Sequence, residues 1–221
     1  MKSASVKFIT LGVVLVLALS GSAGAVIKKK SRFRLQHRSQ IELRLGLFDG
    51  VNLDGDFFYD GVVSRHTSDD LLVAVGFNHW ADETLAFNVS VRVLASDYYS
   101  GVSSAGTYEA GYAVVPIFVG FRHYLGRPGS WSTVRPYLTA AGGPVIGSQS
   151  LSLVGYDVVD ETRTVTAGGA HLGGGIDFLV SRHVMFGVNG GYNLISDFDE
   201  PIGGHVNYSG AEFGVGFGFV F

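Results

Sequence analysis

Apolar and polar residues alternate along most of the chain after residue 40, with the two-residue period of a β-strand. In "TLAFNVSVRVLA" (84–95), alternate positions from Leu85 to Val93 are apolar, and the positions between them are Ala, Asn, Ser and Arg. The last ten residues, "EFGVGFGFVF" (212–221), show the same alternation, with glycines between the aromatic residues. A period of two places one face of each strand against an apolar medium and the other against something polar or small.

Eight segments carry this pattern, and the connections between them alternate in length. The segments are 40–48, 70–80, 84–95, 112–125, 134–147, 166–180, 183–194 and 212–221. Short turns at 81–83 and 181–182 and a turn of intermediate length at 126–132 alternate with longer connections expected to be loops at 49–69, 97–110, 148–163 and 195–208. Outer-membrane barrels have an even number of antiparallel strands, short periplasmic turns and long outer loops. The sequence therefore predicts an all-β, eight-stranded, antiparallel up-and-down transmembrane β-barrel in a bacterial outer membrane.

The chemistry of the two strand faces distinguishes this prediction from a soluble barrel. A soluble lipocalin-type barrel keeps its bulky apolar residues inside. Here charged residues share a face with glycine, alanine, serine and asparagine, opposite leucine, valine and phenylalanine. We expect the first face to line a lumen too narrow for bulky side chains.

Seven charged residues fall on the predicted lumen face. Isolated charges in a narrow lumen are costly, so we expect them to pair, either as a structural network that closes the lumen or as a gate or proton path. Arg92 should lie farther from the short turns than Arg44 and Arg122, because it comes late in its strand. The seven residues are Glu42, Arg44, Arg92, Arg122, Arg135, Asp177 and Glu212.

Composition adds the domain organisation. Residues 1–25 have two lysines, a twelve-residue apolar stretch (8–19) and "AGA" before a cut after Ala25, which is typical of a signal peptide. Twelve apolar residues are too few for a membrane-spanning helix, which needs about 20. Residues 26–39 form a basic segment with six Lys/Arg. We expect this segment to lie in the periplasm, where it has no nucleic acid to bind. The barrel (40–221) has 8 arginines and no lysine against 19 Asp/Glu, a difference of −11.

Several stretches resemble a known family. The terminal "EFGVGFGFVF" resembles the signal at the end of bacterial outer-membrane proteins, which the assembly machinery reads; the matching positions are Phe213, Val215, Phe217, Phe219 and Phe221. "VPIFVGFRHYL", "RPYLTAAGG" and "AHLGGGIDFLVSRHVMFGVNGGYNL" resemble the small outer-membrane β-barrel domain family, the OmpA/OmpX/OmpW-like group. That family shares a fold more than a function, so the resemblance implies little about activity.

The residues that could bind a metal or act in catalysis do not form a pattern typical of an enzyme. The acidic loop at 49–69 hints at calcium but fails the EF-hand spacing, so we predict no metal site there beyond loose binding of divalent cations. "RHTSDD" offers His66, Ser68 and Asp69, the residue types of lipid-A deacylase barrels, but neighbours in one loop do not form a nucleophile–base pair. We predict no catalytic residues and no cofactor. Aromatic residues are expected at the membrane interfaces: Trp80, Tyr124 and Trp131 at the turns, and Tyr98, Tyr99, Tyr108, Tyr192 and Tyr208 at the loops.

Two functions remain open. The first is a structural or surface-interaction barrel that acts through its long acidic loops, with outer-membrane lipids and lipopolysaccharide as partners and a monomeric state. The second is a narrow pore or passage for small molecules, hydrophobic ones included. A lipid-A-modifying enzyme is a distant third. The ligand is not encoded in any motif of the sequence.

Overall fold

The computed structural model describes residues 35–50, 55–59, 62–66, 69–103, 106–125, 133–155 and 159–221. The predicted signal peptide and most of the basic segment lie outside these residues, so both stay predictions. Within the described ranges, no helix has the length and hydropathy needed to cross a membrane.

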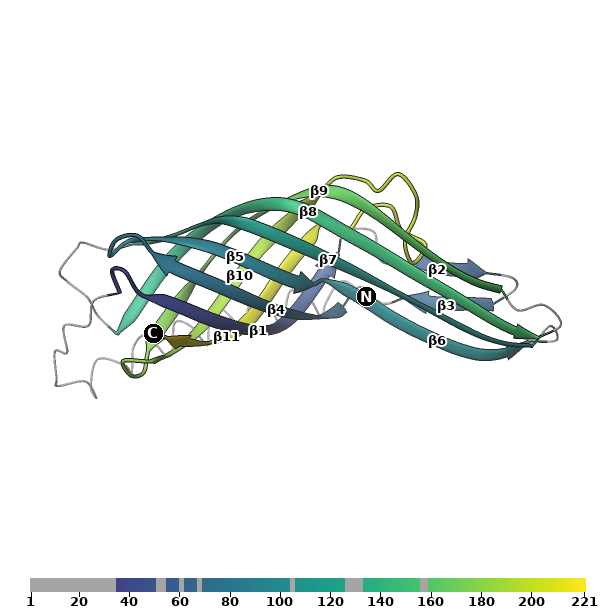
Figure 1. The fold of residues 1–221 in the computed structure, drawn as a ribbon, viewed down its shortest axis with the longest axis horizontal. Helices are drawn as coiled ribbons and strands as arrows, with labels where there is room; N and C mark the ends of the chain where they lie inside the picture. The colour runs from purple at the N-terminus through teal and green to yellow at the C-terminus, as the bar shows by residue number, and fades with distance from the viewer. Residues whose placement is uncertain are drawn as a thin grey trace, which may run out of the picture. The chain divides into compact units, whose positions relative to one another are not determined.

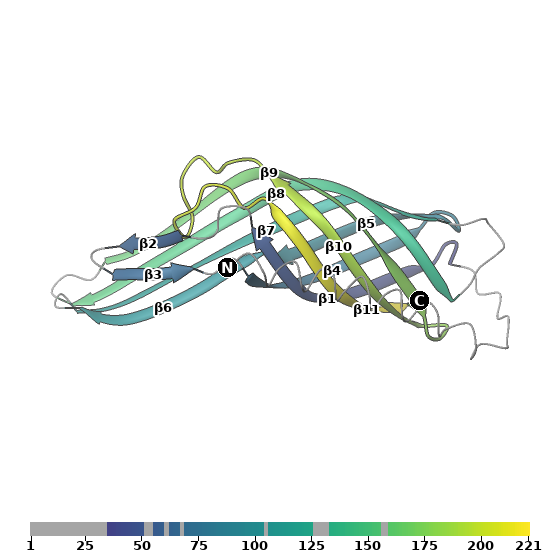
Figure 2. The same ribbon diagram turned by 180° about the vertical axis from the view of Figure 1, so that it is seen from behind.

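The described residues form antiparallel strands, and eight of them close into a ring. The hydrogen-bonded order is β5-β4-β1-β11-β10-β9-β8-β7, and β5 pairs with β7 to close it (Figures 1 and 2). Strands β2 and β3 form a separate two-stranded sheet, and β6 pairs with β7 beyond β5. The bounds are β1 Ser39–Gly50, β2 Gly55–Tyr59, β3 Val62–His66, β4 Asp69–Trp80, β5 Leu85–Val93, β6 Ala95–Ser103, β7 Gly106–Tyr124, β8 Val134–Gly155, β9 Val159–Leu179, β10 Val184–Ile195 and β11 Gly210–Val220. The predicted fold class is confirmed.

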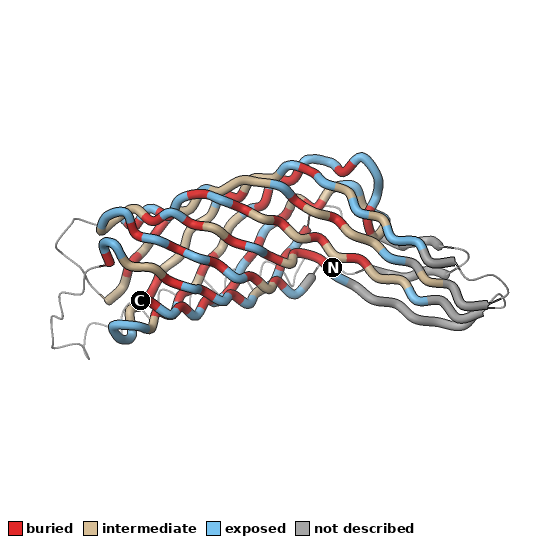
Figure 3. Tube along the Cα trace, in the orientation of Figure 1, coloured by how far each residue is buried: buried red, intermediate tan, exposed pale blue. Residues whose placement is uncertain are grey.

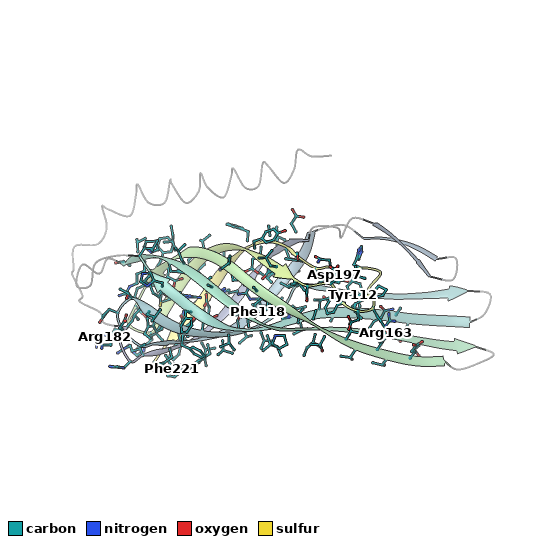
Figure 4. All side chains as sticks on the ribbon, turned by 90° about the horizontal axis from the view of Figure 1, so that it is seen from above. Tyr112, Phe118, Arg163, Arg182, Asp197 and Phe221 are labelled. Carbon is teal, nitrogen blue, oxygen red and sulfur yellow. The ribbon has the colours of Figure 1, made fainter. Side chains whose placement is uncertain are left out.

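The two ends of the ring differ. We call the end with the short connections β4–β5, β7–β8 and β9–β10 the turn end; there Ser39 and Phe221 exchange backbone hydrogen bonds of 2.9 Å. The other end is the loop end. Figure 4 shows Arg182 and Phe221 at the turn end, and Tyr112, Arg163 and Asp197 at the loop end.

Three of the four predicted loops contain strands, since segment 49–69 holds β2 and β3. Segment 97–110 belongs mostly to β6 and β7, and segment 148–163 to β8 and β9, so these strands continue far beyond the ring. The prediction failed because periodicity marks a strand only where its two faces meet different media. Past the ring this contrast between lipid and lumen is lost, and sequences such as "SQSLS" and "ETRTVT" show no apolar face.

A β-bulge separates β5 from β6. Val91 pairs with Ile117 and Ala95 with Val114, so four steps on one strand match three on the other. The intervening Leu94 donates its N–H to the Val114 carbonyl at 3.0 Å and is fully buried. A bulge of this kind bends the strand and increases its twist. Here it lies where the closed ring gives way to the extended sheet of β6–β9.

The outside of the ring is an apolar belt. Along the strands buried and exposed residues alternate, as the red and blue bands of Figure 3 show. The exposed members are large: Leu43, Phe121, Leu138, Leu172 and Phe217 are each 47–57% exposed. An outward apolar band on a closed barrel, whose backbone groups pair within the ring, suits a lipid bilayer.

Asp82 shapes the β4–β5 turn. Its carboxylate accepts hydrogen bonds from the Thr84 N–H at 2.6 Å, the Thr84 hydroxyl at 2.8 Å and the Leu85 N–H at 2.8 Å. These donors hold the pKa of Asp82 below its ordinary value. Side-chain bonds to the following backbone are a common device for closing a tight turn.

The closed ring should make the protein heat-modifiable on detergent gels. Every strand of the ring pairs on both sides, so no edge opens without breaking a whole ladder. We expect unboiled and boiled samples to migrate at different positions. Identical migration of the two samples would contradict the closed barrel.

Candidate functional site in the barrel lumen

The lumen near the turn end holds a buried ion-pair network, which we call the turn-end layer. Arg122 from β7 donates to Glu42 Oε2 at 2.7 Å and to Asp177 Oδ2 at 3.2 Å. Arg44 binds both oxygens of Glu42, at 2.9 and 3.0 Å. The Tyr124 hydroxyl donates to Asp177 at 2.6 Å. Arg122 is fully buried and both carboxylates are 2% exposed, so β1, β7 and β9 are joined across the lumen by desolvated charges.

Neutral groups fill the space around this network. Asn78 donates to Gln40 at 3.0 Å and to Glu42 at 3.1 Å, and it accepts from Asn88 at 2.7 Å. The Arg122 guanidinium lies 4.3 Å from the centre of the Tyr137 ring, within cation–π range. These contacts extend the layer to β4, β5 and β8, so side chains from six strands meet at one level of the lumen.

A second polar group, the middle layer, lies farther from the turn end. Arg92 Nη1 donates to Glu212 at 2.9 and 2.8 Å, and Asn193 donates to the same carboxylate at 2.8 Å. The His171 Nδ1 lies 3.2 Å from Arg92 Nη1 and 3.1 Å from Asn193 Oδ1. All four residues are at most 5% exposed. Arg92 is thus separated from Arg44 and Arg122 and has its own carboxylate.

Toward the loop end the lumen is apolar. A cluster of buried side chains fills it, and we call this cluster the apolar plug. The Arg92 guanidinium lies 5.5 Å from the Phe118 ring, which connects the plug to the middle layer. Figure 4 shows Phe118 between the two ends. The plug consists of Phe48, Leu72, Leu94, Ala95, Tyr112, Val114, Phe118, Val145, Ala167, Ile195, Phe198, Ile202 and Tyr208.

Glycines make room for these large side chains. A Cβ on Gly216 would lie 2.8 Å from Glu42 Oε1, and a Cβ on Gly175 would lie 2.8 Å from the Tyr137 hydroxyl. The glycines between the phenylalanines of β11 therefore have a packing role. The expected exclusion of bulky side chains from the lumen is wrong, because rows of glycine on one wall leave space for arginine and aromatic residues on another.

Adding a methyl group at Gly175 should destabilise the barrel. Its Cβ would also collide with the Val188 carbonyl oxygen, so backbone must move. We expect Gly175→Ala to lower the free energy of unfolding by about 1–3 kcal/mol. Gly190→Ala is the control, because its Cβ meets nothing nearer than 3.4 Å. Urea unfolding in liposomes measures both, and equal midpoints would contradict the packing role.

Comparisons with known proteins show the fold but no family membership. No family model matches the chain, and no curated protein matches it. Among solved structures, Ail, the attachment invasion locus protein of Yersinia pestis, aligns with a TM-score of 0.50 and 13% identity over 84% of this chain and 99% of Ail. A major outer membrane protein from Thermus thermophilus aligns with a TM-score of 0.52 and 9% identity over 83% of this chain and 98% of that protein.

The fold is that of a small outer-membrane β-barrel. With the apolar belt, this fold supports the predicted outer-membrane location. At these identities the likeness carries no information on activity.

The structure places all seven predicted lumen charges inside. Glu42, Arg44, Arg122 and Asp177 meet in the turn-end layer, and Arg92 and Glu212 meet in the middle layer. Arg135 is 2% exposed and pairs in β-register with Asp177. The five positions of the predicted assembly signal, Phe213, Val215, Phe217, Phe219 and Phe221, face outward and are 43–54% exposed.

Three of the predicted interface aromatics, Trp80, Tyr124 and Tyr208, are buried inside the barrel. Trp80 and Tyr124 are at most 1% exposed, and their rings lie 6.1 Å apart. The prediction failed because it used distance from the turn and ignored the strand face. Tyr208 belongs to the apolar plug, whereas Tyr192 is 39% exposed. Trp131 and the side chains of Tyr98, Tyr99 and Tyr108 lie outside the described residues.

Most side chains of the first predicted loop lie outside the described part of the structure. They include the candidate catalytic residues His66, Ser68 and Asp69. Among the residues that are described, no three His, Asp or Glu side chains gather as a metal site. Sequence reasoning missed His171 and Asn193 as members of the middle layer. Both lie on the lumen face of their strands, opposite apolar neighbours, and that alternation was the signal available.

Proposed function

We propose that the protein is a closed structural barrel that presents its loop end to the surroundings of the cell, without a continuous pore. The observation that carries this proposal is the filling of the lumen at three levels: two buried polar layers and the apolar plug. A buried carboxylate with two arginine partners is costly to separate, which favours a permanently closed turn-end layer.

The loop end supports a surface-interaction role. There, β6–β9 continue past the ring as a sheet. Five of the charges that the structure shows exposed in this region are acidic: Glu109, Glu161, Asp197, Asp199 and Glu200. Arg163 pairs with Glu200 at 2.7 Å. An acidic surface favours cationic or neutral partners.

This charge sets the protein apart from one structural neighbour. The Yersinia pestis Ail structure was obtained with the heparin analogue sucrose octasulfate, a polyanion. Polyanions are disfavoured by the acidic loop end of the present chain. Outer-membrane lipids and lipopolysaccharide remain the proposed surroundings, with divalent cations bridging their phosphates to the acidic side chains, and the barrel acts as a monomer.

Single-channel recording in planar bilayers tests the closed barrel. We expect no conductance steps from the purified protein. A variant in which residues 196–209 are replaced by a short Gly–Ser linker should also stay silent, because the two polar layers remain. Reproducible steps from the unmodified protein would favour the alternative, a narrow passage for small molecules.

A further inference from the structure

The β10–β11 connection, residues 196–209, folds back into the loop end of the barrel. Phe198 is 3% exposed, and Ile202 and Tyr208 are fully buried, although all three belong to a connection rather than a strand. Their acidic neighbours Asp197 and Glu200 are exposed. The connection therefore inserts these three side chains and leaves the two carboxylates in solvent.

These three side chains occupy an apolar chamber built by the barrel. Its walls come from several strands and the bulge, and include Phe48 from β1, Leu72 from β4, Phe118 from β7, Val145 from β8 and Ile195 from β10. Its floor is the middle layer, where the Arg92 charge is already bound by Glu212. The chamber thus offers burial to an apolar group and no free charge for an ionic one.

Packing inside the chamber indicates which shape it accepts. The rings of Phe198 and Tyr208 meet edge to face, with centroids 6.0 Å apart and planes at 70°. The absence of a side chain at Gly147 admits two of these groups: a Cβ there would lie 2.9 Å from Ile202 and 3.2 Å from Phe198. The Tyr208 hydroxyl donates to the Ile202 carbonyl, so its polar atom is satisfied within the connection itself.

Polar contacts tie the connection to β8 and β9. At its start, Ser196 and Gly168 on β9 exchange hydrogen bonds of 2.9–3.1 Å. Arg163 on β9 binds Glu200 Oε2 and the Pro201 carbonyl, each at 2.7 Å. The Gly203 N–H donates to Gln149 on β8 at 2.9 Å. The Arg163 and Glu200 side chains are 37% and 54% exposed, so water competes for this pair and it contributes little. Burial of its three apolar side chains also holds the connection in place, and another apolar group can supply the same burial.

We propose that the chamber is a dead-end binding site for a small neutral aromatic molecule. The molecule takes the place of the Phe198 and Tyr208 rings, residues 196–209 act as the gate, and the Arg163–Glu200 pair is its latch. The ligand is neutral because the walls are apolar and the floor charges are paired. The site is a dead end because both polar layers lie between it and the turn end.

Cysteine accessibility tests the gate, since the chain has no native cysteine. Ala167→Cys places a thiol in the chamber, where Ala167 is 9% exposed. Ser150→Cys, at an exposed position of β8, is the matched control. A membrane-impermeant maleimide should modify the thiol at position 167 much more slowly than the thiol at position 150. Adding Arg163→Ala should speed modification at 167 by about two- to fivefold, as expected for loss of an exposed pair, and leave 150 unchanged.

Indole is the probe for the site. In the Arg163→Ala background, millimolar indole should slow modification at 167 several-fold and leave the rate at 150 unchanged. Equal rates at 167 and 150 without indole would show that the connection does not close the chamber. If indole does not slow modification at 167, or slows it equally at 167 and 150, the proposed binding site is wrong.

Gel mobility before and after boiling verifies that each variant is folded. Ala95→Cys, at a fully buried plug position, is a second reporter if Ala167→Cys does not fold. These outcomes are independent of the conductance test, because a gated dead-end site requires no current.

Discussion

Arg122→Ala should lower the free energy of unfolding by about 3–5 kcal/mol, the cost of leaving a buried charge without its partner. Arg122 is fully buried and contacts both Glu42 and Asp177. Without it, Glu42 keeps Arg44, but Asp177 loses the arginine that donates to it at 3.2 Å and keeps the Tyr124 hydroxyl. Urea unfolding in liposomes, followed by tryptophan emission, measures the change; Trp80 lies beside Tyr124 and reports on this layer.

Arg182→Ala is the matched control. Arg182 is exposed in the β9–β10 turn, and its backbone carbonyl, which accepts from Arg38 at 3.2 Å, survives the substitution. We expect its stability to stay within about 0.5 kcal/mol of wild type. The double variant Arg122→Ala/Asp177→Asn should recover part of the loss, because the uncompensated charge is gone. An unchanged midpoint for Arg122→Ala would contradict the role of the turn-end layer.

Phe221→Ala should reduce the amount of protein that reaches the outer membrane several-fold while leaving the stability of the folded barrel almost unchanged. The Phe221 ring is 54% exposed, so its removal costs little packing. Its backbone hydrogen bonds to Ser39 are retained in the variant. A loss in assembly without a loss in stability would therefore identify the ring itself as a recognition feature.

The measurement compares outer-membrane fractions in cells with urea midpoints of refolded protein. Leu138→Ala is the control, because Leu138 is similarly exposed on the apolar belt at 55% but lies outside the terminal stripe. Wild-type levels of Phe221→Ala in the outer membrane would refute the assembly signal. A large drop in stability would instead assign Phe221 a structural role.

The sequence alone predicts the eight ring strands, and each predicted segment overlaps a strand of the ring. Within the bilayer one face of a strand meets lipid and the other meets the lumen. Apolar and polar residues therefore alternate, as they do from Leu85 to Val93. The same contrast places Glu42, Arg44, Arg92, Arg122, Asp177 and Glu212 inside. Local alternation is sufficient for these conclusions because each depends on one strand at a time.

The ion pairs inside the lumen, and the side chains that fill it, could be identified only from the tertiary structure. Arg122 pairs with Asp177, 55 residues away in the sequence, and Arg92 pairs with Glu212, 120 residues away. No local sequence pattern predicts which carboxylate each arginine binds. The strand extensions beyond the ring lack an apolar face, and β6 and residues 106–111 of β7 are recognised only through their shared hydrogen bonds. The burial of Phe198, Ile202 and Tyr208 depends on a chamber that exists only once the ring closes, because walls from separate strands must surround them before burial becomes favourable.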